Sequence, residues 1–160
     1  MQCIYEQNDF YQLAKKQPAA IIGHFPVRKY IHLSSAPQVI TFVREPSERV
    51  ISEFKHHRRH ANYKGSLLEF AKLPQNKNKM HRYLRGVPWS LLGFIGLSER
   101  YDESLVLLNK QFNFDIAHNA LNKAPEHQLV DVYASQKLVL KKLNHLDYKL
   151  YERVLKSFEW

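Results

Sequence analysis

Three short apolar runs stand out in the hydrophobic pattern of the chain, and polar residues follow each of them. They are residues 19–23 (AAIIG), 38–43 (QVITFV) and 91–97 (LLGFIGL). The second run is rich in β-branched residues, and Pro37 before it and Pro46 after it mark places where a strand does not easily continue. We therefore expect three strands of one sheet, with residues 38–43 buried.

Helical spacing follows the second and third runs. Pro46 suits the first turn of one helix, and Ser98 is a plausible cap for another. The apolar positions are Val50, Ile51 and Phe54 in the first segment and Tyr101, Leu105, Leu108 and Phe112 in the second. Each of these two strands is therefore expected to pass through a turn into an amphipathic helix.

The end of the chain also has the pattern of a helix. Its apolar residues recur every three or four positions, at Leu143, Leu146, Leu150, Val154 and Phe158. This spacing predicts one long amphipathic helix. Strands that alternate with helices favour an α/β fold with a mostly parallel sheet, in which ligands bind beyond the carboxyl ends of the strands. We therefore expect the chemistry near residues 23–28 and 44–52.

The composition indicates a single globular domain over residues 1–160, with 44% hydrophobic residues, no internal repeat and no Gly/Ser linker. Cys3 is the only cysteine, which excludes an intrachain disulfide and a cysteine-cluster zinc site. No apolar run reaches the roughly 18 residues of a membrane span. Glu6 and Asp9 lie where a secretion signal would be apolar, so we expect a soluble chain and prefer the cytoplasm.

Charge narrows the class of partner. Lys and Arg number 24 and Asp and Glu number 15, which gives a formal charge of +9 with the nine histidines left neutral. A positive field of this size favours an anionic partner. Nucleic acid, an acidic glycan, a phosphate-rich cofactor and a membrane surface all meet that description, so the charge alone does not choose among them.

The segment 41–57 (TFVREPSERVISEFKHH) places Arg44 at the end of a strand and Ser52 in the second turn of the next helix. The guanidinium, the hydroxyl and the unpaired N–H groups of the helix start together suit a phosphate. In the alternative interpretation, Arg44 pairs with Glu45 or Glu48 and Ser52 is an ordinary residue of the helix surface. The spacing by itself leaves both open.

The same residues carry a resemblance to a known family. Arg44-Glu45-Pro46, Arg49 and Ser52-Glu53-Phe54 resemble the segment with which carbohydrate sulfotransferases bind a 3′-phosphate. Four further segments resemble the heparan sulfate sulfotransferases in matching order, and they are residues 23–24 (GH), 78–84 (NKMHRYL), 94–99 (FIGLSE) and 143–151 (LNHLDYKLY). The resemblance covers about residues 20–155 and implies a parallel-sheet, P-loop-like sulfotransferase fold of the α/β class that is incomplete at its N-terminus.

The resemblance implies a sulfate donor and a role for six residues. The donor is 3′-phosphoadenosine 5′-phosphosulfate (PAPS), whose sulfuryl group moves to a carbohydrate hydroxyl and leaves adenosine 3′,5′-bisphosphate. Arg44 and Ser52 would bind the 3′-phosphate, and His24 would be the catalytic base, a role that suits an imidazole. The expected substrate-binding residues are His56, Asn78 and Arg82. The alternatives are a partly buried histidine at a strand end for His24 and an ordinary amphipathic helix around residues 78–84.

A cationic run, residues 56–60 (HHRRH), ends the helix that contains Ser52. It suits sulfate or carboxylate groups of an acidic glycan, and it is equally consistent with a solvated charged face. His56 and His60 have the spacing of a helical metal site. Because no third ligand is identifiable, we predict no metal.

One part of the family pattern is missing. Residues 1–18 contain no glycine and no threonine, so they do not supply the loop that wraps the 5′-phosphosulfate in sulfotransferases. We expect this chain to be inactive alone, as a fragment, a natural truncation or a chain completed by a partner. A sheet that lacks a strand has an open edge, so we also expect a homo-oligomer.

A second hypothesis comes from a different class of protein. The +9 charge is consistent with a non-catalytic module that binds acidic glycan or nucleic acid. Nucleic acid is the less favoured ligand, because no recognition motif accompanies the basic residues.

Overall fold

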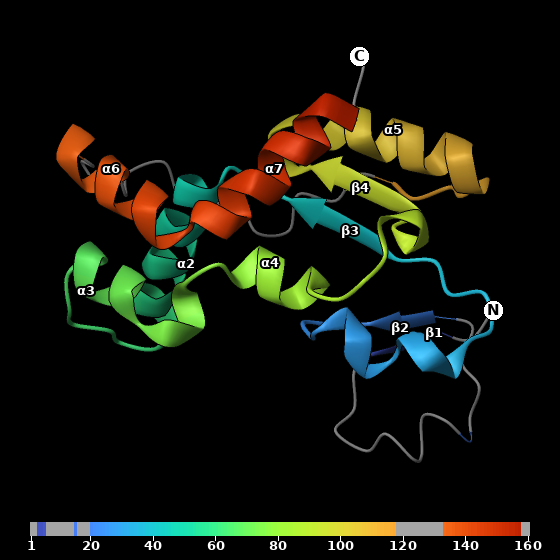
Figure 1. Cartoon of the computed structure of the whole chain (residues 1–160), viewed down its shortest axis with the longest axis horizontal. Coiled ribbons are helices and arrows are strands. Elements are labelled where there is room, and N and C mark those ends of the chain that lie inside the picture. Colours follow the sequence, from blue (N-terminus) through green and yellow to red (C-terminus); the bar gives the residue numbers. More distant parts are fainter. Residues whose placement is uncertain (1–2, 6–14, 16–19, 118–132, 158–160) are drawn as a thin grey trace. The chain divides into compact units, whose positions relative to one another are not determined.

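The computed structural model describes residues 3–5, 15, 20–117 and 133–157 of the chain (Figure 1). It has a mixed α/β architecture that is mostly helical and contains short parallel strands, which confirms the predicted class. The chain divides into two compact units, one of residues 1–40 and 82–94 and the other of residues 41–81 and 95–160. The single domain over residues 1–160 stays a prediction, because compact units of this kind can belong to one domain.

The first unit contains a two-stranded parallel sheet of β1 (Cys3–Tyr5) and β2 (Ala20–Ile22), in which Ile4 lies opposite Ile21. Three short 3-10 turns belong to the same unit: η1 (Val27–Lys29), η2 (Ile31–Leu33) and η4 (Trp89–Leu91). Tyr30 is buried between η1 and η2 and meets the ring of Phe25 edge-on at 4.7 Å. Strand β2 confirms the first predicted strand, but it pairs with β1 rather than with the two others.

The second unit contains β3 (Ile40–Val43) and β4 (Phe94–Leu97) except for the first residue of each strand. The two strands pair with each other and run in the same direction in Figure 1. Strand β4 is buried at all four positions, whereas only Val43 is buried in β3. The expectation of a buried strand at residues 38–43 is therefore wrong for β3. Gly96 lets the ring of Phe42 lie against β4, because a Cβ at this glycine would come within 2.5 Å of two ring atoms.

Each strand of this sheet leads into a helix, as the sequence predicts. Strand β3 is followed by α2 (Pro46–His60), and β4 is followed by the turn η5 (Ser98–Arg100) and α5 (Tyr101–Phe112). Ser98 does not cap α5, since that helix begins three residues later and its N-cap makes no side-chain hydrogen bond. Instead, the hydroxyl of Ser104 accepts a hydrogen bond from the N–H of Leu97 at 2.9 Å, which ties α5 to the end of β4.

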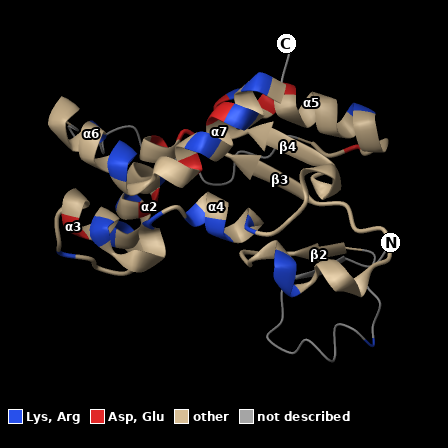
Figure 2. Ribbon diagram, in the orientation of Figure 1, with Lys and Arg blue, Asp and Glu red and all other residues tan. Residues whose placement is uncertain are grey.

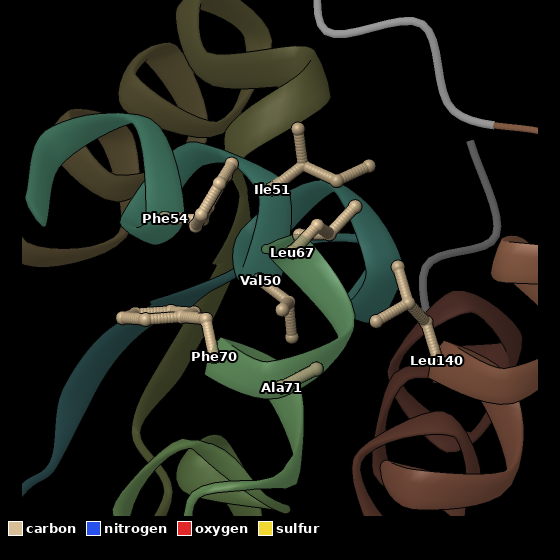
Figure 3. Packing of buried hydrophobic residues seen from close by; sticks show 7 residues of the cluster. All are labelled: Val50, Ile51, Phe54, Leu67, Phe70, Ala71 and Leu140. Carbon is tan, nitrogen blue, oxygen red and sulfur yellow. The ribbon is translucent and has the colours of Figure 1, made fainter. Parts of the chain in front are cut away.

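The core of the second unit joins α2 to α3 (Leu67–Lys72) and α6 (Ala134–Leu143). Ser66 and Glu69 begin α3 with a reciprocal capping box. The seven buried residues of the cluster, drawn in Figure 3, are Val50, Ile51, Phe54, Leu67, Phe70, Ala71 and Leu140. Burial of each large side chain contributes about 1.5–3 kcal/mol, so this cluster fixes the position of α2.

The C-terminal helix that the sequence predicts forms over residues 145–157 and carries Leu146, Leu150 and Val154. Its first expected position, Leu143, belongs to the preceding helix, and Phe158 lies outside the described residues. Helix α6 ends at Leu143 and α7 (His145–Ser157) begins two residues later, with Asn144 between them at φ −119° and ψ 30°. The Asn144 carboxamide donates to the carbonyl of Leu140 at 3.0 Å and so ends α6. Two short elements, η3 (Pro74–Asn76) and α4 (Lys79–Leu84), complete the described chain. Within these ranges, no helix has both the length and the apolar composition needed to cross a bilayer.

Candidate functional site

The turn from β3 to α2 carries the candidate phosphate site. Arg44 directly follows β3, and Glu45 is the N-cap of α2, where its carboxylate accepts the N–H of Glu48 at 2.7 Å. Pro46 occupies the next position and has no N–H to offer. The positive end of α2 is therefore already matched by a carboxylate of its own. A phosphate at this turn would depend on side chains more than on the backbone of the helix start.

Arg44 and Ser52 are both half-buried. Neither side chain makes a hydrogen bond or an ion pair with any other residue in the described part of the chain. The pairing of Arg44 with Glu45 or Glu48, which the spacing left open, does not occur in the structure. The donors of this guanidinium thus remain available to an anion.

Glu45 instead bonds to a tyrosine of α7. The hydroxyl of Tyr148 donates to the Glu45 carboxylate, and its oxygen lies 2.7 Å from the hydroxyl oxygen of Ser47. A phenol has one proton, so Ser47 must be the donor in the second contact. Burial and the hydrogen bond to Glu45 raise the pKa of Tyr148 to about 12. Tyr148 is therefore neutral at physiological pH, and it holds α7 against the start of α2.

A pocket of about 440 Å³ opens beside this cluster. One part of its wall is formed by Glu45, Ser47 and Tyr148, and another part by α6, where Lys137 and Lys141 lie one turn apart. The full lining is Glu45, Ser47, Glu48, Ala134, Lys137, Leu138, Lys141 and Tyr148. Neither Arg44 nor Ser52 lines this pocket. The ammonium of Lys141 lies 5.4 Å from the centre of the Tyr148 ring, a cation–π contact.

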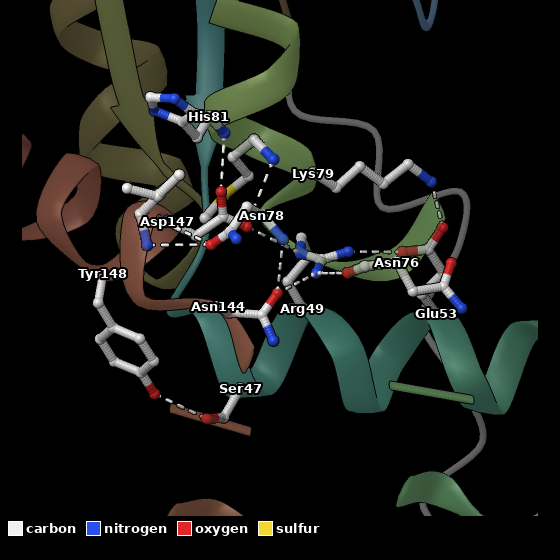
Figure 4. Close-up of polar contacts among 12 residues, drawn as sticks. Ser47, Arg49, Glu53, Asn76, Asn78, Lys79, His81, Asn144, Asp147 and Tyr148 are labelled. Atoms are coloured by element: carbon white, nitrogen blue, oxygen red, sulfur yellow. Dashed lines mark hydrogen bonds and ion pairs between the residues drawn. The ribbon is translucent and has the colours of Figure 1, made fainter. Parts of the chain in front are cut away.

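Arg49 belongs to the same motif as Arg44 and Ser52, but it points into the protein. It lies at the centre of a network of polar residues (Figure 4). One terminal nitrogen of Arg49 donates to Glu53 at 2.7 Å, and the other donates to the carbonyl of Asn76 at 2.8 Å and to Asn144 at 3.2 Å. Its Nε lies 3.7 Å from the carboxylate of Asp147. The side chain of Arg49 is only 12% exposed, so these contacts fasten α2 to the segments around it.

Two asparagines complete this network. The carboxamide oxygen of Asn78 accepts the N–H groups of Leu146 at 2.9 Å and Asp147 at 3.3 Å, which are unpaired donors of the first turn of α7. The N–H of Asn78 donates in turn to Asn144 at 3.0 Å. Asn78 has φ +47°, a left-handed conformation that asparagine tolerates better than most residues. Its side chain therefore caps α7 from a distant part of the sequence.

Asp147 is fully buried within the network. Its carboxylate accepts the N–H of His81 at 2.7 Å and that of Met80 at 3.4 Å. Burial raises the pKa of Asp147 above its ordinary value, and the hydrogen bond from His81 and the charge of Arg49 oppose that shift. Lys79 adds a second cation by pairing with Glu53, so two cations face two carboxylates.

The six predicted site residues are divided between the two units. The second unit holds Arg44, Ser52, His56 and Asn78, and the first holds His24 and Arg82. His24 is exposed and follows β2, and Arg82 is exposed on α4. On α2, Ser52 and His56 lie one turn apart on the same side of the helix. The roles of all six stay predictions.

Four of the five segments that resemble sulfotransferases lie wholly or partly in the second unit, where they contact one another; residues 82–84 and 94 of these segments belong to the first unit. The N–H of Glu45 donates to the carboxylate of Glu99, which joins residues 44–54 to residues 94–99. Arg49 and Asn78 both bond to Asn144, which joins residues 44–54 and 78–84 to the segment 143–151. The fifth segment, with His24, belongs to the first unit.

Sequence reasoning missed several residues that shape this region. Ser47, Lys137 and Lys141 had no role assigned, and Asn144 and Asp147 were noted only as part of a resembling segment. A signal for Asp147 exists in the pattern, because a carboxylate lies four positions after Leu143 on the apolar side of a helix. Comparisons of this chain with protein-family models, with curated proteins and with solved structures find no match.

Proposed function

We propose that this chain is a protein of the carbohydrate sulfotransferase type whose second unit binds the 3′-phosphate of PAPS. The observation that carries the proposal is the state of Arg44. It is a half-buried guanidinium at the carboxyl end of a strand, and it has no anionic partner among the described residues. Loop and strand ends of this kind are where α/β proteins bind ligands, and a guanidinium matches phosphate with two parallel hydrogen bonds.

In this proposal each side chain has a definite task. Arg44 neutralises and orients the 3′-phosphate, and Ser52 adds one hydroxyl donor from the side of α2. His56, one turn further along α2, contacts the acceptor sugar. The roles of His24 as base and of Arg82 toward the sugar rest on the resemblance alone, because both residues belong to the first unit. The bound donor supplies the sulfuryl group and the leaving nucleotide.

The fit of the donor is partial. The guanidinium and the hydroxyl suit a phosphate, but the Glu45 carboxylate at the start of α2 repels one, and it already uses a backbone N–H there. Asn78 also has less freedom than a binding residue needs, since its carboxamide oxygen accepts two backbone N–H groups. Its contribution to the site is therefore to fix the ends of α4 and α7. Transfer of the sulfuryl group further requires a loop around the 5′-phosphosulfate, which residues 1–18 lack the glycine and threonine to form.

Binding is the direct test, because it does not require that loop. Isothermal titration of the full chain should show tighter binding of adenosine 3′,5′-bisphosphate than of adenosine 5′-monophosphate. We expect Arg44→Ala to lower the affinity for the bisphosphate about tenfold or more, as loss of a charged hydrogen-bonding pair does. Ser52→Ala should have a smaller effect. Binding of the monophosphate should change little in either variant.

Arg59→Ala is the matched control. It removes the same charge from an exposed position at the far end of α2, so a general electrostatic effect would lower binding equally in both arginine variants. Equal affinity for the two nucleotides, or equal losses in Arg44→Ala and Arg59→Ala, would contradict the proposal.

The alternative function, a basic module for acidic glycan, has a different signature. Heparin binding that weakens steeply with salt and is indifferent to Arg44 and Ser52 would favour it. Figure 2 shows basic residues distributed over α4, α6 and α7, with acidic residues among those of α7. A module that binds acidic glycan by charge alone would favour basic residues gathered on one element, and they are not gathered in this way. We therefore prefer the phosphate proposal to this alternative.

A further inference from the structure

The end of α2 brings two imidazoles together on its surface. His56 and His60 are separated by one helical turn, and their ring centres lie 4.5 Å apart with an angle of 39° between the ring planes. Both residues are exposed, and neither ring has a hydrogen-bonding partner within the described ranges. Their nitrogen atoms are therefore accessible from solvent.

This spacing matches what two neighbouring ligands of a metal ion require. A metal–nitrogen bond to imidazole is about 2.0–2.1 Å long, so two rings bound at adjacent coordination positions have their centres roughly 4.5–5 Å apart. The observed separation falls at the short end of that interval. The sequence predicts no metal here because no third ligand is identifiable, but two ligands suffice for an open site. We propose that His56 and His60 form a two-histidine site for a divalent transition-metal ion and that this site binds Cu²⁺ more tightly than Ni²⁺ or Zn²⁺.

The surroundings determine what completes the coordination shell. His57 is half-buried, and its ring lies 5.1 Å from that of Phe70, on the side of α2 that faces α3. Among the residues that the structure describes, no group of three or more histidine, cysteine or carboxylate side chains could hold a metal. Water therefore fills the remaining positions, which makes the site open and its ion exchangeable.

Nearby positive charge limits the affinity and selects the metal. Lys55 and Arg59 precede the two histidines in the sequence, while the guanidinium of Arg58 lies 5.7 Å from the centre of the Phe54 ring, on another side of the helix. Repulsion by these cations disfavours every divalent ion to a similar extent. The strength of the metal–imidazole bond then decides the order, and this strength is greatest for Cu²⁺.

Titration of the full chain, without an affinity tag, with Cu²⁺, Ni²⁺ and Zn²⁺ tests this site. Loss of either ligand should lower the affinity at least about tenfold, since even the removal of a group that only orients a ligand costs 10–100-fold. We expect His56→Ala and His60→Ala to have similar effects, and the double variant to bind no more weakly than either single one. Such non-additivity is the signature of one shared ion.

Two controls keep the outcome decisive. His57→Ala removes a histidine of the same run, and His145→Ala removes an exposed histidine of α7, and both should bind the metals like the original chain. Circular dichroism verifies that each variant is folded. Unchanged affinity in His56→Ala or His60→Ala, or an equal loss in a control variant, would overturn the proposal. Nucleotide binding by Arg44 and Ser52 involves neither imidazole, so failure of the metal site and failure of the nucleotide site are distinguishable, although His56 is shared with the proposed sugar contact.

Discussion

Within the second unit, the residues of one motif divide into two groups with opposite surroundings. Arg49 and Glu53 point into the protein, where every charge meets a counter-charge or a hydrogen-bonding partner. Arg44 lies in the turn before α2 and Ser52 lies within α2, but their side chains bond to no other described residue. The first group explains why the segment folds as it does. Only the second group has donors left for a ligand, so the candidate site is much smaller than the motif.

Asp147→Ala should cause the largest change, because it removes a fully buried carboxylate that faces the Nε of Arg49 and leaves this guanidinium with Glu53, a carboxylate that it shares with Lys79. Breaking a buried ion pair costs about 3–5 kcal/mol, and the N–H groups of His81 and Met80 lose their acceptor as well. Chemical denaturation followed by circular dichroism measures the free energy of unfolding. Glu152→Ala, an exposed carboxylate of the same helix, should change it by less than about 0.5 kcal/mol. If the two variants are equally stable, the network is not structural.

Asn78→Ala should have the next largest effect, about 2–3 kcal/mol. It removes the acceptor for two N–H groups of α7 and places an alanine at φ +47°. Asn62→Ala separates the two causes, since Asn62 has φ +51° but is exposed and makes no side-chain hydrogen bond with the described residues. This control should cost only the backbone strain, about 1 kcal/mol. Equal losses would mean that the cap on α7 contributes nothing.

The pH dependence of stability provides a test of smaller expected size. Burial raises the pKa of Asp147 above its ordinary value of 3.8, so the folded chain holds this proton more tightly than the unfolded chain does. The stability contributed by protonation is fully present below the unfolded pKa and is lost as the pH rises through the folded pKa. We therefore expect the difference in unfolding free energy between the original chain and Asp147→Asn to shift against the original chain as the pH rises from 3.

That difference is the quantity to measure, because other carboxyl groups titrate in the same range. The pKa of Glu69, for example, is lowered by its hydrogen bonds with Ser66, which has the opposite effect on stability. A pH-independent difference would show that Asp147 ionises as freely in the folded chain as in the unfolded one.

Local patterns in the sequence predicted much of the fold. The strand-to-helix passages at β3–α2 and β4–α5 follow from apolar runs next to helical spacing, and they form as expected. Burial along β3 was wrong because an apolar run of this length does not reveal whether a strand is covered on both sides. Ile40 in this strand is 40% exposed. Strand pairing depends on contacts between residues far apart in the sequence. The pairing of β2 with β1 could therefore not be predicted from the hydrophobic pattern either.

The break between α6 and α7 has a similar cause. Apolar residues keep helical spacing on both sides of Asn144, so the spacing does not reveal that one helix ends there and another begins. The end of α6 depends on hydrogen bonds between the side chain of Asn144 and Arg49, Asn78 and Leu140. The candidate site shows the same limit. Sequence reasoning identified Arg44 and Ser52 from their residue types and spacing. Only the structure shows which polar side chains of the motif already have hydrogen-bonding partners within the protein.

Arg44→Ala should have the smallest effect on stability, less than about 0.5 kcal/mol, because this side chain has no partner to lose among the described residues. The same variant is expected to have the largest effect on binding of adenosine 3′,5′-bisphosphate. Thermal unfolding and titration of one preparation measure both quantities. A large loss of stability would place Arg44 with the structural residues of the motif, and its half-buried guanidinium would then have a partner other than a ligand.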